Sequence, residues 1–205
     1  SGIRALKDLG QVGTLAVSST ATWSLFLQKT VDLKGVQLVP YTGTVSQFLL
    51  NADFAHQGYS ISEPFVARSK GSDPHSLLVA DIGFNPYASV LIATEEAIAE
   101  RTDIVAAMVH ASIAGWDHYL RDPEQTNRHI HQLNPEMGMD ILAYGARESQ
   151  PLILDATARA EGVHRAKRAE VAARERDVAR PSNVDVDGGL AASIWVVVAA
   201  VQELE

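Results

Sequence analysis

The sequence predicts an α/β fold with three parts. A parallel-sheet lobe over residues 3–82 is followed by a hinge and helical segment over residues 83–155 and by an atypical helical tail over residues 156–205. Two observations predict this arrangement. Short apolar runs alternate with helix-forming segments in the first part, which is the pattern of a parallel sheet with helices on both faces. From residue 95 onward the apolar positions follow helical spacing instead.

Each expected strand of the lobe is a short apolar run followed by a segment that can start a helix. The expected strands are residues 13–18, 36–39, 54–59 and 77–82, and the expected helices are residues 21–30, 45–51 and 62–70. Residues 88–93 form a further apolar run of buried-strand length, after a turn marked by Gly83, Asn85 and Pro86.

The region after this run is expected to be helical. Thr94 is a suitable N-cap, and Glu95 and Glu96 lie in the first turn, where the helix dipole favours acidic groups. Thr102 opens a longer helix with one wide face expected to be buried. That face consists of Ile104, Val105, Met108, Val109, Ser112, Ile113, Trp116 and Tyr119. Asp122-Pro123 begins the next helix and Asn134-Pro135 ends it.

The tail differs from the rest of the chain. Arginine is concentrated between Arg159 and Arg180 among Ala and Glu, which favours a solvated helix. Residues 188–201 are apolar but fewer than the ~20 that span a bilayer, so we interpret them as a buried helix or strand.

Composition excludes several classes of function. The net charge of -8 argues against a nucleic-acid surface, and the chain has no cysteine for a disulfide, a thiolate metal site or a nucleophile. No histidine or carboxylate spacing matches a metal site, and no nucleophile or phosphate-loop motif is present, so we expect no metal, no cofactor and no catalytic residue.

Two groups of polar residues follow predicted strands. Ser18, Ser19, Thr20 and Thr22 come after the first strand, and Tyr59, Ser60 and Glu63 come after the third. Ligands of open α/β sheets bind beyond the carboxyl ends of the strands. Each group also has a structural interpretation, because the hydroxyls are good helix caps and Glu63 suits the first turn of a helix. Asn85 is either a site residue or part of a hinge turn.

Five patches, taken in order and spacing, resemble the solute-binding proteins of ABC importers. The resemblance is to the branch for nitrate, alkanesulfonates and thiamine-precursor pyrimidines, and it covers roughly residues 3 to 150. The patches are residues 3–9, 58–64, 81–87, 90–94, and 115–120 with Asp122-Pro123. The resemblance implies a type II periplasmic-binding-protein-like fold, with a second lobe followed by the returning helical part of a first lobe that is otherwise missing.

The same resemblance implies a periplasmic binding protein. Its partners would be a small polar or aromatic organic solute and the membrane permease of an ABC importer, and its ligand would contact the Ser18–Thr22 loop, the Tyr59–Glu63 corner and Asn85. Two alternatives stay open. One is an enzyme similar to the family's pyrimidine-precursor synthases, which carry a cysteine cluster that this chain lacks. The other is a truncated fold that binds no solute and forms a homodimer through uncovered apolar surface.

Overall fold

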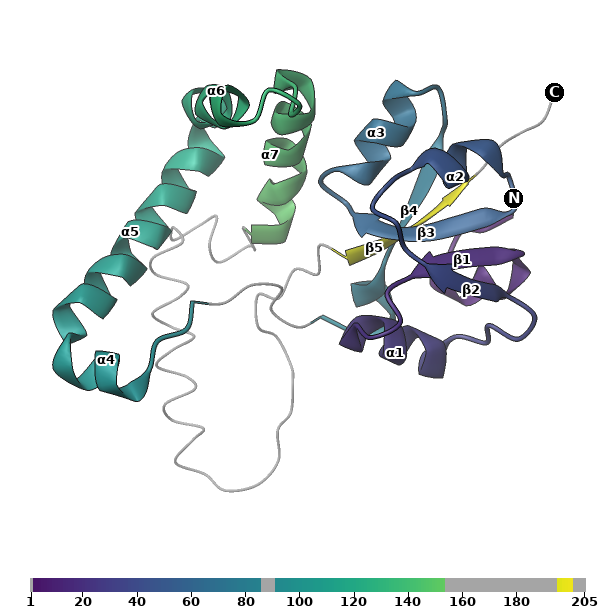
Figure 1. Cartoon of the computed structure of the whole chain (residues 1–205), viewed down its shortest axis with the longest axis horizontal. Coiled ribbons are helices and arrows are strands. Elements are labelled where there is room, and N and C mark those ends of the chain that lie inside the picture. The colour runs from purple at the N-terminus through teal and green to yellow at the C-terminus, as the bar shows by residue number, and fades with distance from the viewer. Residues whose placement is uncertain (1, 86–90, 154–194, 201–205) are drawn as a thin grey trace. The chain divides into compact units, whose positions relative to one another are not determined.

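The computed structural model describes residues 2–85, 91–153 and 195–200 of the 205-residue chain. The chain divides into two compact units, residues 1–88 with 192–205 and residues 89–191 (Figure 1). The first unit contains a β-sheet, and the described part of the second consists of helices.

The first unit is built on a sheet with the strand order β2-β1-β3-β5-β4. The strands are β1 Thr14–Val17, β2 Gln37–Pro40, β3 Phe54–Tyr59, β4 Pro74–Leu78 and β5 Trp195–Ala200. Strand β1 pairs in parallel with β2 and with β3, so the predicted parallel sheet is confirmed for these three strands.

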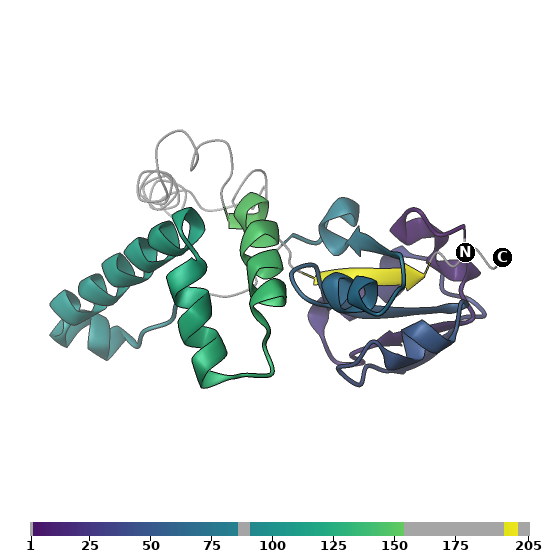
Figure 2. The same cartoon turned by 90° about the horizontal axis from the view of Figure 1, so that it is seen from above.

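Strand β5 changes the other half of the sheet. It lies between β3 and β4 and runs antiparallel to both (Figure 2). The expectation of a helical tail is therefore wrong for Trp195–Ala200, and a strand is the correct alternative for that run. Its three consecutive valines suit a pleated, hydrogen-bonded strand. The remaining tail residues lie outside the described residues.

Helices cover both faces of the sheet, as predicted. On one face, helix α1 (Thr22–Thr30) and the 3-10 helix η1 (Leu6–Gln11) enclose a core with Leu15 and Val17 of β1. On the other face, α2 (Ser46–Leu50) and α3 (Glu63–Ser69) pack over Ala16 of the same strand. Successive side chains of β1 thus enter different cores, as strand geometry requires.

Two predicted strands differ from the structure. The run expected as a strand over residues 77–82 is split, because β4 ends at Leu78 and a 3-10 helix η2 (Val79–Ile82) follows. The turn closes when the Gly83 N–H donates to the Ala80 carbonyl, with Gly83 at φ 94°. In the run over residues 88–93, residues 91–93 are exposed and form no strand, while residues 86–90 lie outside the described residues.

The second unit confirms the predicted helical segment. Its helices are α4 Glu95–Glu100, α5 Thr102–Arg121, α6 Glu124–Leu133 and α7 Met139–Ile153. The Ala97 N–H donates to Thr94 Oγ1, which confirms Thr94 as a side-chain cap of α4. The end of α5 is tied to its neighbours, because Tyr119 donates to Asn127 of α6 and Gln150 of α7 donates to the Leu120 carbonyl.

Candidate functional site

The carboxyl ends of β2, β1 and β3 meet at one edge of the sheet. Tyr41 follows β2, Ser18 follows β1, and Tyr59 ends β3. The Ser18 backbone N–H donates to Gln57 Oε1 at 2.5 Å, which fixes the start of the loop after β1 against β3. The predicted Ser18–Thr22 loop and Tyr59–Glu63 corner therefore leave neighbouring parallel strands at the same edge.

The hydroxyl groups of the loop after β1 do not cap α1. Its N-cap is Ala21, whose methyl side chain makes no capping hydrogen bond. The prediction that Ser18, Ser19 or Thr20 caps this helix is therefore wrong. Ser19, Thr20 and Thr22 are exposed at the start of the helix, where the dipole favours an anion or a carbonyl oxygen.

Glu63 is surrounded by donors of its own chain. Its Oε1 accepts from the Tyr41 hydroxyl at 2.8 Å, and its Oε2 accepts from the Tyr59 backbone N–H at 2.8 Å and from the Ser62 hydroxyl. Glu63 is also the first residue of α3, with Pro64 next, as the structural interpretation expected. The carboxylate thus links the ends of β2 and β3 to the start of α3.

Gly58 leaves the room that Glu63 occupies. A Cβ atom at Gly58 would lie 3.0 Å from the Glu63 Cβ, 3.1 Å from its Cγ and 3.2 Å from its Cδ. These distances are shorter than ordinary van der Waals contact, so the Glu63 carboxylate can take this position only because residue 58 is glycine.

An aromatic cluster lies beneath the same edge. The Tyr41 ring stacks on His56, with centroids 5.6 Å apart and planes 6° apart, and Phe48 meets the imidazole edge-on at 5.2 Å. His56 is only 1% exposed, and its Nδ1 lies 2.5 Å from the Gln57 carbonyl. A carbonyl oxygen only accepts hydrogen bonds, so Nδ1 carries the proton.

Burial sets the ionisation of both rings. Loss of solvation lowers the pKa of His56, against opposing effects of the Gln57 carbonyl and the Glu63 charge. Burial, reinforced by the hydrogen bond to Glu63, raises the pKa of Tyr41. The cluster therefore presents a neutral imidazole and a protonated phenol.

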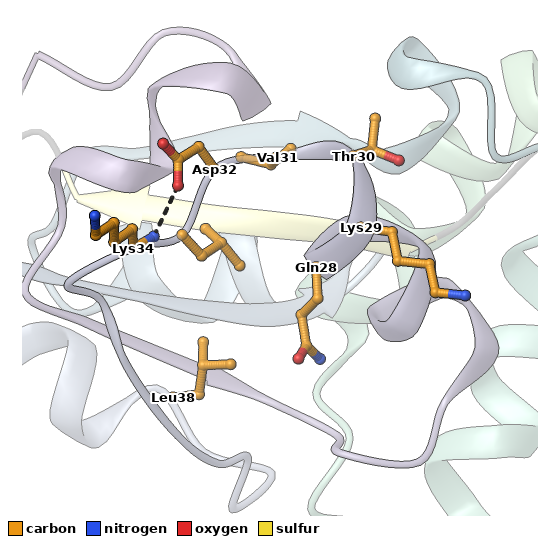
Figure 3. A pocket seen from close by; sticks show the side chains of 8 residues that line it. Gln28, Lys29, Thr30, Val31, Asp32, Lys34 and Leu38 are labelled. Atoms are coloured by element: carbon orange, nitrogen blue, oxygen red, sulfur yellow. Dashed lines mark hydrogen bonds between the residues drawn. The ribbon is translucent and has the colours of Figure 1, made fainter.

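Hollows lie at two places among the described residues of the first unit. One, of about 290 Å³, includes Tyr41, Thr42, Thr44 and His56 in its lining and lies along the β2-β1-β3 face beside α2. The other, of about 540 Å³, is lined by residues 28–34 and Leu38 at the end of α1 (Figure 3). The second contains none of the predicted site residues. Its visible hydrogen bond, from the Lys34 N–H to Asp32 Oδ1 at 3.1 Å, is local to the loop.

The remaining predicted residues occupy different places. Ser60 lies half-buried in the corner after β3, whereas Asn85 is exposed at the end of the described part of the first unit. The neighbouring Phe84 packs against Phe26 of α1, with ring centroids 5.1 Å apart.

Sequence reasoning missed Tyr41 and Gln57. The signal for Gln57 was a polar side chain inside an otherwise buried strand, whereas Tyr41 stood in a turn and had no comparable signal.

An open α/β lobe with polar groups at the strand ends is the architecture of a periplasmic-binding-protein-like lobe. The family model described as NMT1/THI5 like matches residues 1–126, which is more than half of the chain. The chain therefore belongs to the NMT1/THI5-like family, and the resemblance seen in the sequence is confirmed. No curated protein and no solved structure matches the chain.

This family comprises solute-binding proteins of ABC importers, which are typically extracytoplasmic, and synthases of the THI5 type. In the part of the chain that the structure describes, no helix combines the length and apolar character needed to cross a membrane.

Proposed function

We propose that this chain is the substrate-binding component of an ABC importer and that it recognises a small polar or aromatic organic solute. The observation that carries the proposal is the group of exposed hydroxyls at the start of α1, which the helix does not use as caps. They stand at the carboxyl end of β1, where open α/β sheets bind ligands.

The two strand ends have different roles in this proposal. Ser18, Ser19, Thr20 and Thr22 supply hydroxyl and amide groups for an anionic or carbonyl part of the solute. Tyr59 and Ser60 border the solute from the corner after β3, and Asn85 contributes from the segment beside α1. Glu63 acts mainly by positioning Tyr41 and Tyr59, because its oxygens already accept bonds from three donors of the chain.

The protein would work in the periplasm with a membrane permease, as family members of this type do. The net charge of -8 supports a partner other than nucleic acid. The family's synthases carry a cysteine cluster, and this chain has no cysteine. The composition therefore favours solute binding over synthase activity.

Calorimetry and thermal shift with the full chain test the proposal. The probes are an alkanesulfonate, nitrate, an aminopyrimidine and a flavin. We expect one of them to raise the melting temperature, and Ser19→Ala to weaken its binding by about 0.5–1.5 kcal/mol, the usual value of one hydrogen bond.

Ser69→Ala is the matched control. Ser69 is an exposed serine at the far end of α3, where its hydroxyl donates to the Val66 carbonyl. Equal affinity in the wild type, Ser19→Ala and Thr22→Val variants would contradict the site. Conversion of a probe to a new pyrimidine, detected by mass spectrometry, would favour the synthase instead.

A further inference from the structure

Gln57 is a polar side chain inside a buried strand. It lies in β3, where every residue but the last is buried, and it is itself only 7% exposed. Strand β3 has a neighbour on each side of the sheet, β1 and β5, so its backbone is held along both edges. A buried amide costs free energy unless its carbonyl and its NH2 group both find partners. The two ends of this amide therefore need separate explanations.

The fold explains the carbonyl end. The Ser18 backbone N–H donates to Gln57 Oε1 at 2.5 Å, directly after the end of β1. Because a backbone N–H can only donate, the amide atom that faces it must be the oxygen, and this fixes which way the amide is turned. Nε2 is bonded to the same carbon as Oε1, so the NH2 group also lies beside the loop after β1.

The fold leaves the NH2 end unexplained. Among the residues that the structure describes, none accepts a hydrogen bond from Gln57 Nε2. An unpaired donor on a buried side chain is disfavoured, and Leu or Met would fill a similar volume without that loss. A donor at a strand end is, in contrast, what a binding site needs, because the ligand then supplies the acceptor.

The loop after β1 offers further donors. In the described part of the chain, no backbone hydrogen bond is donated by the N–H groups of Ser19 and Thr20. Thr22 is the first residue of the nine-residue helix α1, where the helix dipole adds partial positive charge. Together with the NH2 group of Gln57, these groups suit a ligand that presents oxygen acceptors to this strand end.

We propose that Gln57 is a specificity-determining residue of the site after β1. Its NH2 group donates to an oxygen atom of the bound solute, while its carbonyl holds the Ser18 N–H. The inference rests on the proposed function, because it assigns a residue and a hydrogen-bond direction to the same site. The solute must present an acceptor here, such as a carbonyl or sulfonyl oxygen. A solute with an N–H or ammonium group at this point is rejected, because two donors would then face each other without an acceptor.

Two substitutions separate this role from a purely structural one. Gln57→Glu keeps an oxygen that accepts from the Ser18 N–H but removes the NH2 donor, whereas Gln57→Met removes both groups. We expect both variants to weaken binding of an acceptor solute by about tenfold, near the upper end for one lost hydrogen bond. If Gln57 only holds the loop, Gln57→Glu should bind like the wild type and Gln57→Met should not.

Two controls accompany these variants. Gln28→Glu adds the same charge at an exposed glutamine of α1, whose side chain donates to Ser24 Oγ, and it should leave the affinity unchanged. The NMR signal of the Ser18 N–H reports whether the loop keeps its hydrogen bond. It should stay near its wild-type position in Gln57→Glu and move in Gln57→Met.

A measurement on the wild-type chain needs neither a variant nor the natural solute. The isotopically labelled full chain is titrated with methanesulfonate and N,N-dimethylacetamide, which only accept hydrogen bonds, and with methylammonium, which only donates them. We expect the side-chain NH2 signals of Gln57 to shift saturably with at least one acceptor probe and not with methylammonium. No saturable shift with either acceptor, or an equal shift with methylammonium, would overturn the inference.

The results distinguish this inference from the proposed function. If a solute raises the melting temperature of the wild type and binds Gln57→Glu with unchanged affinity, the role of Gln57 is overturned while solute binding stands. If the Gln57 NH2 signals shift saturably with an acceptor probe but no candidate solute binds, the donor role of Gln57 stands and the importer function loses its support.

Discussion

Replacing Tyr41 by Phe tests whether the carboxylate of Glu63 holds the strand ends together. The variant deletes the hydroxyl that donates to Glu63 Oε1 at 2.8 Å and keeps the ring that stacks on His56. A hydrogen bond to a charged group is worth about 1.5–3 kcal/mol, and water replaces part of it at a half-buried site, so we expect a loss of about 1–2 kcal/mol in unfolding free energy.

Glu63→Gln should cost more than Tyr41→Phe. The amide removes the charge from all three of its hydrogen bonds and turns one acceptor into a donor, which then faces the Tyr59 N–H or the Tyr41 hydroxyl. We expect a loss of about 2–3 kcal/mol. In the double variant the missing hydroxyl no longer matters, so the two losses should fall short of additivity by about 1 kcal/mol.

Urea unfolding, followed by circular dichroism and tryptophan fluorescence, measures all four proteins of this cycle. Losses that add to within about 0.3–0.5 kcal/mol, as independent sites do, would refute the direct link between Tyr41 and Glu63. The same cycle separates stability from binding. If Glu63 holds the strand ends in place and does not contact the solute, Glu63→Gln should weaken solute binding no more than Tyr41→Phe does.

Three further changes follow from the structure. Gly58→Ala should displace the Glu63 side chain and lower the unfolding free energy by about 1–3 kcal/mol. Urea unfolding would show this as a lower midpoint concentration. An unchanged midpoint would contradict the close approach of Glu63 to the Gly58 backbone. Burial lowers the pKa of His56 below 6.5, so the unfolded chain binds more protons as the pH falls below that value, and stability is lost there by at most about 1.4 kcal/mol per pH unit. His56→Phe should flatten this dependence, and an equally steep urea-midpoint profile from pH 7.5 to 5 would count against a buried neutral imidazole. Gly115→Ala should stabilise the helical unit by about 0.5–1 kcal/mol, because the added Cβ meets no other atom within 4 Å; a lower melting temperature would contradict this reasoning.

Local patterns in the sequence were sufficient for much of the helical unit and for three strands. Thr94 caps α4, and Pro123 and Asn134 bound α6, because caps and prolines act on neighbouring backbone groups. The runs that became β1, β2 and β3 have the length and composition of buried strands, and their parallel pairing follows from the helices between them. The polar loop after β1 was likewise visible as a set of hydroxyls next to a strand.

Only the tertiary structure shows which of these residues contact one another and which side chains are buried by other parts of the fold. Tyr41 reaches Glu63 across 22 positions of sequence, and β5 pairs with strands more than 115 residues earlier, although neither has a local signal for its partner. The face of α5 that the sequence predicts to be buried includes Ile104 and Met108, and this prediction is wrong for the described structure, where the two side chains are 55% and 57% exposed. Periodicity says which residues share a helix face, but whether a face is buried depends on the non-local partners that the fold brings to it.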